Sequence, residues 1–132
     1  MTIKPLMILV AGPYRSGTGD DPQRMAENLH RLEAVTLRLF RAGHMPMIGE
    51  WAALPLLRVA GSTAIGDAVY DEIVYPVADR LLHHCDAVLR LPGASQGADE
   101  DVRLARERGL TVYYDLGQVP GCGEQQVSAL LK

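Results

Sequence analysis

Cysteine is scarce in this chain, whose 132 residues include only Cys85 and Cys122. The two do not form a CxxC pair, so neither a disulfide framework nor a zinc site of the usual spacing is indicated. The adjacent residues His83 and His84 would point apart on a helix, and we therefore expect no metal site. Two thiols without a secretory signal favour a reducing compartment, and we expect a cytoplasmic protein.

Long apolar runs and an excess of basic residues are also missing. No run approaches the roughly 18 residues of a membrane-spanning helix, so the sequence predicts no membrane association. Lysine and arginine number 13 against 16 aspartates and glutamates, which gives a net charge of −3. Because the basic residues are scattered, the sequence predicts no nucleic-acid partner. Arginine nevertheless suits a phosphate or carboxylate group on a small ligand.

The remaining composition is that of an ordinary globular protein. Hydrophobic residues make up 48% of the chain and charged residues 22%, which argues against disorder, collagen and coiled coil. A chain of this length can bury a core of its own, and it contains no repeat, linker or low-complexity segment. We therefore expect a single domain over residues 1–132.

Apolar runs that predict buried strands alternate with stretches of helical periodicity. The expected strands are residues 6–11, 44–48, 86–91 and 110–115. The expected helices are residues 22–41, 52–59, 67–84, 98–108 and 124–131. This alternation predicts an α/β fold: an open, mostly parallel sheet of four to five strands with helices on both faces, in a Rossmann-like or flavodoxin-like arrangement of three layers.

Proline, glycine and aspartate indicate where some of these elements begin, end or bend. Asp21 followed by Pro22 is typical of a helix start, and Gly43 is typical of a helix end. Pro46 favours an edge position for the strand at residues 44–48. Pro76 indicates a kink or a new start within the helix at residues 67–84. Residues 49–66 are the least regular part of the sequence, apart from a short expected helix.

Two loops are candidates for ligand binding, because ligands of open parallel sheets lie beyond the carboxyl ends of the strands. The first, residues 12–20, contains three glycines together with Arg15 and Ser16, a combination that can hold an anion at a helix N-terminus. It matches neither the P-loop nor the dinucleotide fingerprint, and a flexible connection is the alternative interpretation. The second loop, residues 92–97, leads directly into a helix.

The second loop and its helix contain the more specific candidates. Ser95 can cap the helix or offer its hydroxyl to a ligand, and Gly97 allows a tight turn. Three acids follow, which favour a helix N-terminus whatever their function. At about 100° per residue, Asp101 borders the apolar stripe of this helix whereas Glu100 points to solvent. Asp101 is therefore the acid that we expect to face a pocket.

Several of these motifs together resemble the nucleoside 2-deoxyribosyltransferase-like family, particularly its small uncharacterised members. The resemblance extends over about residues 6–115, and the segment around Ser95 is its most specific part. The similar segments are Val10-Ala11-Gly12-Pro13-Tyr14, Asn28, Gly43-His44, Cys85 to Gly93, and Ser95-x-Gly97-Ala98-x-x-Asp101-x-x-x-Ala105-x-x-x-Gly109.

The resemblance implies cleavage of an N-glycosidic bond by a carboxylate nucleophile. Asp101 stands at the nucleophile's position, where characterised members have a glutamate that is one methylene longer. By the same resemblance, an acid near Asp79 assists departure of the base, and Tyr14 orients the nucleophile. A surface ion pair with an arginine is the alternative interpretation of Asp79.

The resemblance also implies a set of substrate-binding residues. A serine at the position of Ser95 helps to bind the 5′-phosphate in the related deoxynucleoside monophosphate N-glycosidases, which favours a nucleotide. Trp51 is a candidate to stack on the base, with core or interface packing as its alternative. The remaining candidates, which would hold the sugar phosphate, are Gly12, Pro13, Arg15, Ser16 and Gly97.

The sequence thus predicts a nucleoside or nucleotide N-glycosidase or deoxyribosyltransferase that needs no cofactor. The alternative is a non-catalytic nucleotide-binding (sensor) domain of the same fold, and a purely structural module is a third possibility. Family members build their sites near subunit contacts, and the apolar stretch 51–59 suits such a contact. We therefore expect a homo-oligomer, either a dimer or a tetramer.

Overall fold

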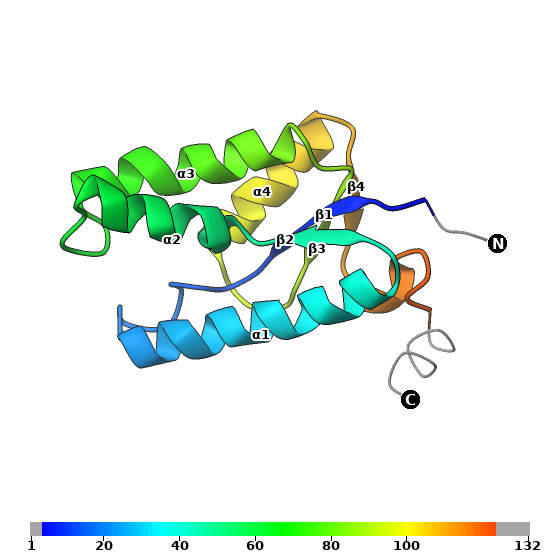
Figure 1. Ribbon diagram of the computed structural model, residues 1–132, viewed down its shortest axis with the longest axis horizontal. Helices are drawn as coiled ribbons and strands as arrows, with labels where there is room; N and C mark the ends of the chain where they lie inside the picture. The colour runs from blue at the N-terminus through cyan, green and yellow to red at the C-terminus, as the bar shows by residue number, and fades with distance from the viewer. Residues whose placement is uncertain (1–3, 124–132) are drawn as a thin grey trace.

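The computed structural model describes residues 4–123, and these residues form a four-stranded sheet flanked by helices (Figure 1). The strands are β1 (Met7–Ala11), β2 (Met45–Met47), β3 (Ala87–Arg90) and β4 (Thr111–Tyr113). The helices are α1 (Pro22–Arg41), α2 (Gly49–Ala60), α3 (Ala68–Leu82) and α4 (Gln96–Glu107), followed by the short 3₁₀ helix η1 (Leu116–Gln118). The expected helix at residues 124–131 lies outside the described residues.

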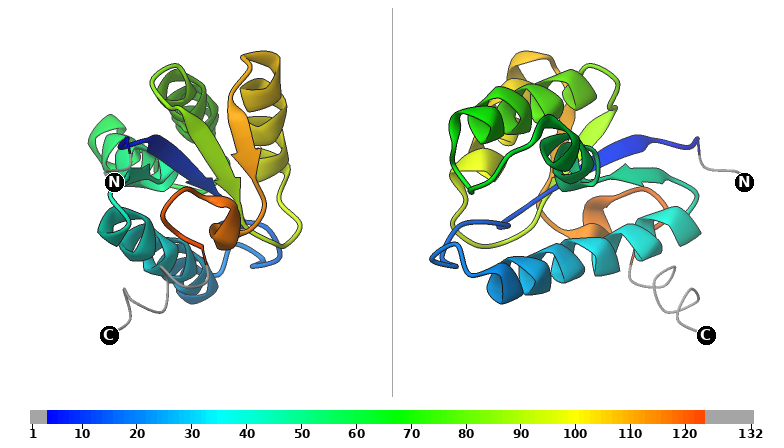
Figure 2. Two further views of the ribbon diagram at one scale, coloured as in Figure 1. Left: turned by 90° about the vertical axis from the view of Figure 1, so that its right-hand side faces the viewer. Right: turned by 60° about the vertical axis from the view of Figure 1, so that its left-hand side comes forward.

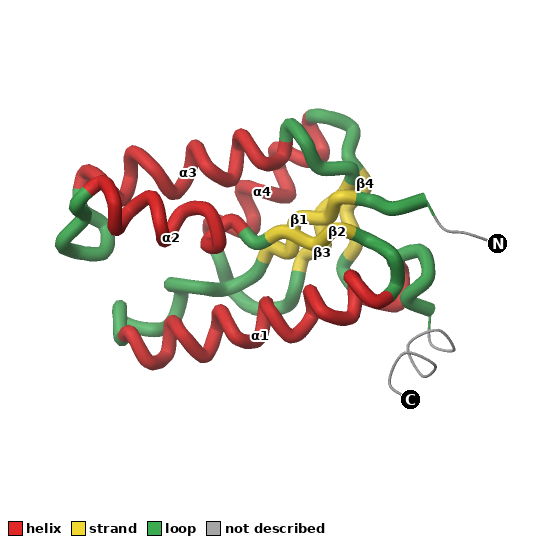
Figure 3. The backbone as a smooth tube through the Cα atoms, viewed as in Figure 1, coloured by secondary structure: helices red, strands yellow, loops and turns green. Residues whose placement is uncertain are grey.

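All pairs of neighbouring strands are parallel, in the order β2-β1-β3-β4. Helix α1 covers one face of the sheet, and α2, α3 and α4 cover the other (Figures 1 and 2). Figure 3 shows the same three layers by element type. The predicted α/β fold with helices on both faces is therefore confirmed.

Each face of the sheet has its own hydrophobic core, because side chains of a buried parallel strand alternate between the two faces. Ile8 and Val10 of β1 point toward α1 and pack with Leu32 and Leu39. The intervening Leu9 packs on the opposite face, with residues of α3 and α4. The apolar run at residues 6–11 is therefore buried on both sides, as the sequence predicted.

Three of the predicted signals are in place, whereas Pro76 does not start a new helix, because it lies inside the continuous helix α3. Asp21 accepts a hydrogen bond from the backbone N–H of Gln23 and caps α1 with Pro22 as the first helical residue. Gly43 has a φ of +102°, the left-handed conformation that favours glycine after a helix. Pro46 lies in β2, which is an edge strand as expected.

Two helices start earlier than the sequence predicted. Helix α2 begins at Gly49, directly after the β2 segment, and it therefore includes Glu50 and Trp51 in its first turn. Helix α4 begins at Gln96, because Ser95 acts as its N-cap. No side chain caps α2, so its start carries no polar signal that the sequence could have revealed.

The strand order reverses between β1 and β3: from β1 the next strand is added on one side of the sheet, and from β3 the next strand is added on the other side. After β1 the chain crosses through α1 to β2, and after β3 it crosses through α4 to β4 on the opposite side and the opposite face (Figure 2). The loops that follow β1 and β3 therefore diverge at the carboxyl edge of the sheet. Such a switch point is where open parallel sheets bind ligands.

Candidate active site

A cavity of about 360 Å³ lies at this switch point, within the range of small-molecule sites. Its walls come from the loops after β1 and β3 and from α2, α3 and α4. Both loops that the sequence singled out therefore meet in one place. The cavity includes seven of the predicted site residues: Gly12, Tyr14, Arg15, Ser16, Ser95, Gly97 and Asp101.

The loop after β1 is held in place by α1. Buried Asn28 donates from Nδ2 to the carbonyl oxygen of Tyr14 at 2.8 Å. At the start of the loop, a Cβ on Gly12 would lie 2.9 Å from Leu32 Cδ2 and 3.2 Å from Leu91 Cβ. Only glycine lets the chain pass this close to both side chains, so the path of the loop into the cavity wall is fixed at two points.

Arg15, which the sequence predicted to bind the anionic group of a ligand, forms an ion pair with the carboxylate of Asp20. Its Nε lies 2.8 Å from Asp20 Oδ1, and its Nη2 lies 3.2 Å from Asp20 Oδ2. The guanidinium also lies over the ring of Tyr70, 5.3 Å from the ring centroid. Both members of this ion pair line the cavity.

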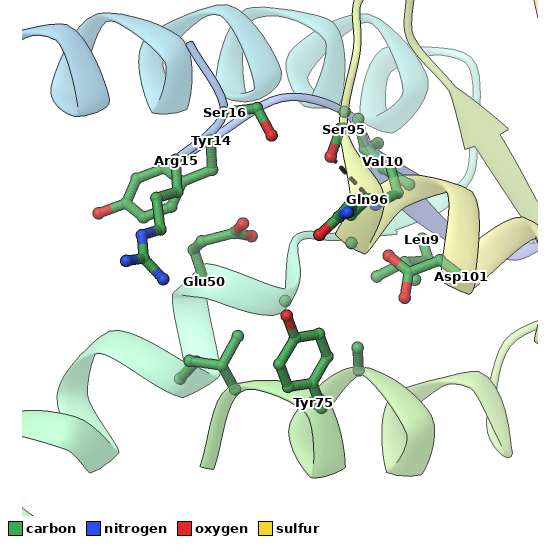
Figure 4. Close-up of a pocket in the computed structure, with 18 of the residues that line it drawn as sticks. Leu9, Val10, Tyr14, Arg15, Ser16, Glu50, Tyr75, Ser95, Gln96 and Asp101 are labelled. Carbon is green, nitrogen blue, oxygen red and sulfur yellow. Dashed lines mark hydrogen bonds between the residues drawn. The ribbon is translucent and has the colours of Figure 1, made fainter. Parts of the chain in front are cut away.

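Ser95 has the capping role that the sequence allowed. The Ser95 hydroxyl oxygen accepts a hydrogen bond of 3.1 Å from the backbone N–H of Ala98, and the side chain is buried (Figure 4). Gly97 does not make the tight turn expected of it, because it lies inside the first turn of α4. The turn is made by Gly93, whose φ is +114°. A glycine at position 97 instead leaves that part of the cavity wall open.

Asp101 points into the cavity from the first half of α4 (Figure 4). Burial raises the pKa of its carboxyl group to about 7, with further contributions from Glu50 and Glu100, while Arg90 acts in the opposite direction. Glu100 itself turns away and bonds to Arg103, whose Nε lies 2.9 Å from Glu100 Oε2. The prediction that Asp101 faces a pocket whereas Glu100 points to solvent is therefore confirmed.

Glu50 is a further carboxyl group in the same cavity, besides Asp101 and the ion-paired Asp20, and it was not among the site residues predicted from the sequence. It lies in the first turn of α2 and points into the cavity from the side opposite Asp101 (Figure 4). Burial is the largest cause of its raised pKa. A usable signal was present, because Glu50 comes just after an expected strand and so lies at the carboxyl edge of the sheet.

Three tyrosines add polar and aromatic surface to the cavity: Tyr14, Tyr70 and Tyr75. Burial and the neighbouring Glu50 both raise the pKa of Tyr14, so Tyr14 lies close to Glu50. Figure 4 shows the hydroxyl of Tyr75 pointing into the space between Glu50 and Asp101. Only Tyr14 of the three was predicted from the sequence.

Three predicted site residues do not line this cavity. Asp79 forms an ion pair with Arg108 that lowers the pKa of the Asp79 carboxyl group, and it faces a more open depression between α3 and α4 that Asp101 also borders. Trp51 donates from Nε1 to Glu33 Oε2 of α1 at 2.8 Å. Pro13 packs against the backbone of Gly93, because a Cβ added to Gly93 would lie 2.7 Å from Pro13 Cγ.

The described residues give no indication of a metal centre. Across residues 4–123, no three or more histidine, cysteine, aspartate or glutamate side chains are grouped so that they could hold a metal ion. Both ring nitrogens of His44 form hydrogen bonds with the backbone: Nδ1 accepts from the N–H of Leu6, and Nε2 bonds to the carbonyl oxygen of Pro120. Within the same residues, no helix combines the length and apolar character that crossing a bilayer requires.

Comparisons of the whole chain with models of protein families and with curated proteins found no match. The nucleoside 2-deoxyribosyltransferase-like assignment therefore stays a prediction. The case for a function depends on the cavity itself.

Proposed function

We propose that the protein cleaves the N-glycosidic bond of a nucleoside or nucleotide, with Asp101 as the nucleophile. The observation that carries this proposal is the pair of carboxyl groups, Glu50 and Asp101, that share one cavity. Cleavage of a glycosidic bond uses two carboxyl groups, one that attacks the sugar and one that donates a proton to the leaving group. The resemblance of the sequence to the 2-deoxyribosyltransferase-like family agrees with this chemistry.

The two carboxyl groups are suited to share one proton. Each has a pKa above its usual range, and the charge of Glu50 contributes to the pKa of Asp101. Neighbouring carboxylates repel each other, so near neutrality a pair with one proton is favoured over a pair with two charges. Because the charge of Glu50 raises the pKa of Asp101, this proton lies mainly on Asp101, and the reaction uses the form in which the proton has moved to Glu50 and Asp101 is ionised.

In the proposed first step, an oxygen of Asp101 bonds to the anomeric carbon and the bond from that carbon to the base nitrogen breaks. The electron pair of the broken bond goes to the base, which takes the proton of Glu50. Water or an acceptor base then attacks the anomeric carbon, loses a proton to Glu50 and releases Asp101 as a carboxylate. Glu50 thereby takes the role that the resemblance gave to Asp79, because Asp79 is engaged by Arg108.

Non-catalytic nucleotide binding is the second candidate, and one observation favours it. Asp101 is a methylene shorter than the glutamate of the characterised transferases, and its pKa of about 7 leaves only part of the molecules with an ionised nucleophile near neutrality. A cavity that binds without reacting would tolerate both features. Turnover separates the two candidates, since only the first predicts free base.

The test is an assay of base release from a panel of nucleosides and 5′-monophosphates, both ribo and deoxy, followed by chromatography. Asp101→Asn and Glu50→Gln are each expected to lower the rate by about 100-fold or more. Asp71→Asn and Glu72→Gln are the matched controls, because both side chains are exposed and line neither of the two cavities described above. Ligand binding without release would favour the second candidate, and neither binding nor release would overturn both.

A further inference from the structure

The charges in the cavity are unbalanced. Four charged side chains line it: Arg15, Asp20, Glu50 and Asp101. The single cation among them is engaged through two of its nitrogens by Asp20, at 2.8 Å and 3.2 Å. The charges of Glu50 and Asp101 are therefore not compensated by any cation in the cavity wall, and a ligand placed between them meets a negative potential.

A 5′-phosphate would fit this arrangement poorly. It carries a charge of about −1.5 to −2 at neutral pH. Asp20 occupies the Nε–Nη2 edge of the guanidinium and neutralises its charge, so a phosphate that approaches Arg15 must either displace Asp20 or bind beside a carboxylate that repels it. Asp20 thus acts toward Arg15 as an anion built into the protein.

A positively charged ligand would fit the cavity well. Placed between Glu50 and Asp101, it would relieve their mutual repulsion and favour the ionised form of both. One face of the Tyr70 ring is already covered by the Arg15 guanidinium, 5.3 Å from the ring centroid, so a cationic ligand would meet the rings of Tyr14 and Tyr75 instead. Of these two, Tyr75 points its hydroxyl between the two carboxyl groups (Figure 4).

We propose that the cavity takes a nucleoside without a 5′-phosphate whose base is positively charged, and that Asp20 disfavours the phosphate by neutralising Arg15. The inference rests on the proposed cleavage of an N-glycosidic bond and narrows its substrate class. With such a base, the electron pair of the broken bond neutralises the ring, so the base leaves without taking a proton, and Glu50 acts only in the second step, where it accepts the proton of the attacking water. The positive charge then moves to the sugar, where Asp101 forms its bond.

The preference for a cation should depend on pH, because Asp101 must be ionised to attract it. The charged and titratable groups that surround Asp101 come from every element packed around it. They are Glu50 of α2; Tyr75, Asp79 and Arg80 of α3; Cys85, which precedes β3; Arg90 at the end of β3; and Glu100 of its own helix. Asp101 carries a pKa of about 7 in this environment. Raising the pH from 6 to 8 therefore converts it from mostly protonated to mostly ionised, and the affinity for a cation should rise by up to about tenfold.

Calorimetric titration with three probes of matched shape tests the inference. The probes are the carbocyclic form of N-ribosyl pyridinium-3-carboxamide, which is cationic, its uncharged dihydropyridine counterpart, and the 5′-monophosphate of the cationic form. Replacing the ring oxygen by a methylene prevents cleavage during the titration. At pH 8 the cationic probe is expected to bind at least about tenfold more tightly than either of the others.

Asp20→Asn tests the role of the internal anion. Asparagine keeps the size of the side chain and tolerates the φ of +60° at this position, so the loop is expected to keep its fold. The variant is expected to bind the 5′-monophosphate about tenfold more tightly than the wild type does. Asp71→Asn, at an exposed position of α3 outside both cavities described above, is the matched control and is expected to leave the affinity for all three probes unchanged.

Two outcomes would overturn the inference: equal affinity for the cationic and uncharged probes at pH 8, or wild-type affinity for the monophosphate that equals or exceeds that for the cationic probe. Both are binding results and do not depend on turnover. Base release from uncharged nucleosides without any cation preference would leave the proposed function standing and remove the inference. Tighter binding of the cationic probe, without base release from any cleavable nucleoside, would support the inference about the ligand and contradict the proposed cleavage.

Discussion

Glu50 and Asp101 belong to different helices, yet the charge of Glu50 is the largest cause, after burial, of the raised pKa of Asp101. The sheet topology explains how they come together. Glu50 starts the helix after β2, and Asp101 lies near the start of the helix after β3. Because all four strands are parallel, both helices begin at the same edge of the sheet. The pair is therefore a product of the fold and not of local sequence.

Removing the charge of Glu50 should lower the pKa of Asp101. Without a neighbouring negative charge, the ionised form of Asp101 is less unfavourable, so Glu50→Gln shifts the pKa from about 7 toward 3.8. The shift should be incomplete, because burial is the larger cause and remains. Titration of the carboxyl carbons by NMR measures the effect, with Glu72→Gln as the exposed control. An unchanged pKa would mean that the two groups do not interact.

Asp101→Asn should make the protein more stable at high pH. The folded pKa of Asp101 lies above the unfolded value of 3.8, so the folded state binds more protons between those values and loses stability as the pH rises from about 4 to 7. An amide has no such penalty. We expect a gain of about 1 to 4 kcal/mol at pH 8 and a smaller gain at pH 5, measured by urea unfolding. A gain independent of pH would contradict the ionisation argument.

The fold could be predicted because its signals are local. The short run at residues 6–11 is apolar on both faces, which is typical of a buried parallel strand, and Asp21 with Pro22 marks the start of α1. The weaker boundary was that of α2, which starts without a capping side chain. Placing Glu50 and Trp51 in a loop was therefore wrong, although the helix itself was expected.

The site was predictable only in part. Asp101 could be distinguished from Glu100 because the phase of a helix follows from its apolar stripe. By contrast, the engagement of Asp79 by Arg108 and of Trp51 by Glu33 depends on how separate helices pack. Such pairings between distant residues leave no pattern in a single sequence. The ion pair between Arg15 and Asp20 was equally unpredictable, because many surface loops contain both residue types without pairing them.

Asn28→Ala should release the loop after β1 from α1. The buried amide bonds to the carbonyl of Tyr14 at 2.8 Å, and its loss leaves that carbonyl without this partner. We expect a loss of about 1 to 2 kcal/mol in the free energy of unfolding and faster amide hydrogen exchange in residues 12–20. Gln23→Ala, at an exposed position of the same helix, should leave the exchange rates of this loop unchanged. Unchanged rates in Asn28→Ala as well would show that the loop holds its position without this bond.

Gly93→Ala and Gly97→Ala should act in opposite directions, although the two glycines are only four positions apart. At Gly93 the φ of +114° is unfavourable for alanine, and the new Cβ would lie 2.7 Å from Pro13 Cγ. We expect a loss of about 1 to 3 kcal/mol, together with separation of the two loops that form the cavity. At Gly97 the backbone is helical and no atom lies within 4 Å of the new Cβ. Alanine is the better helix former, so Gly97→Ala should gain about 0.5 to 1 kcal/mol. Urea unfolding of both variants measures the difference. A loss of stability in Gly97→Ala would mean that the start of α4 is not the open helical turn described here, and that the cavity wall around Asp101 is packed differently.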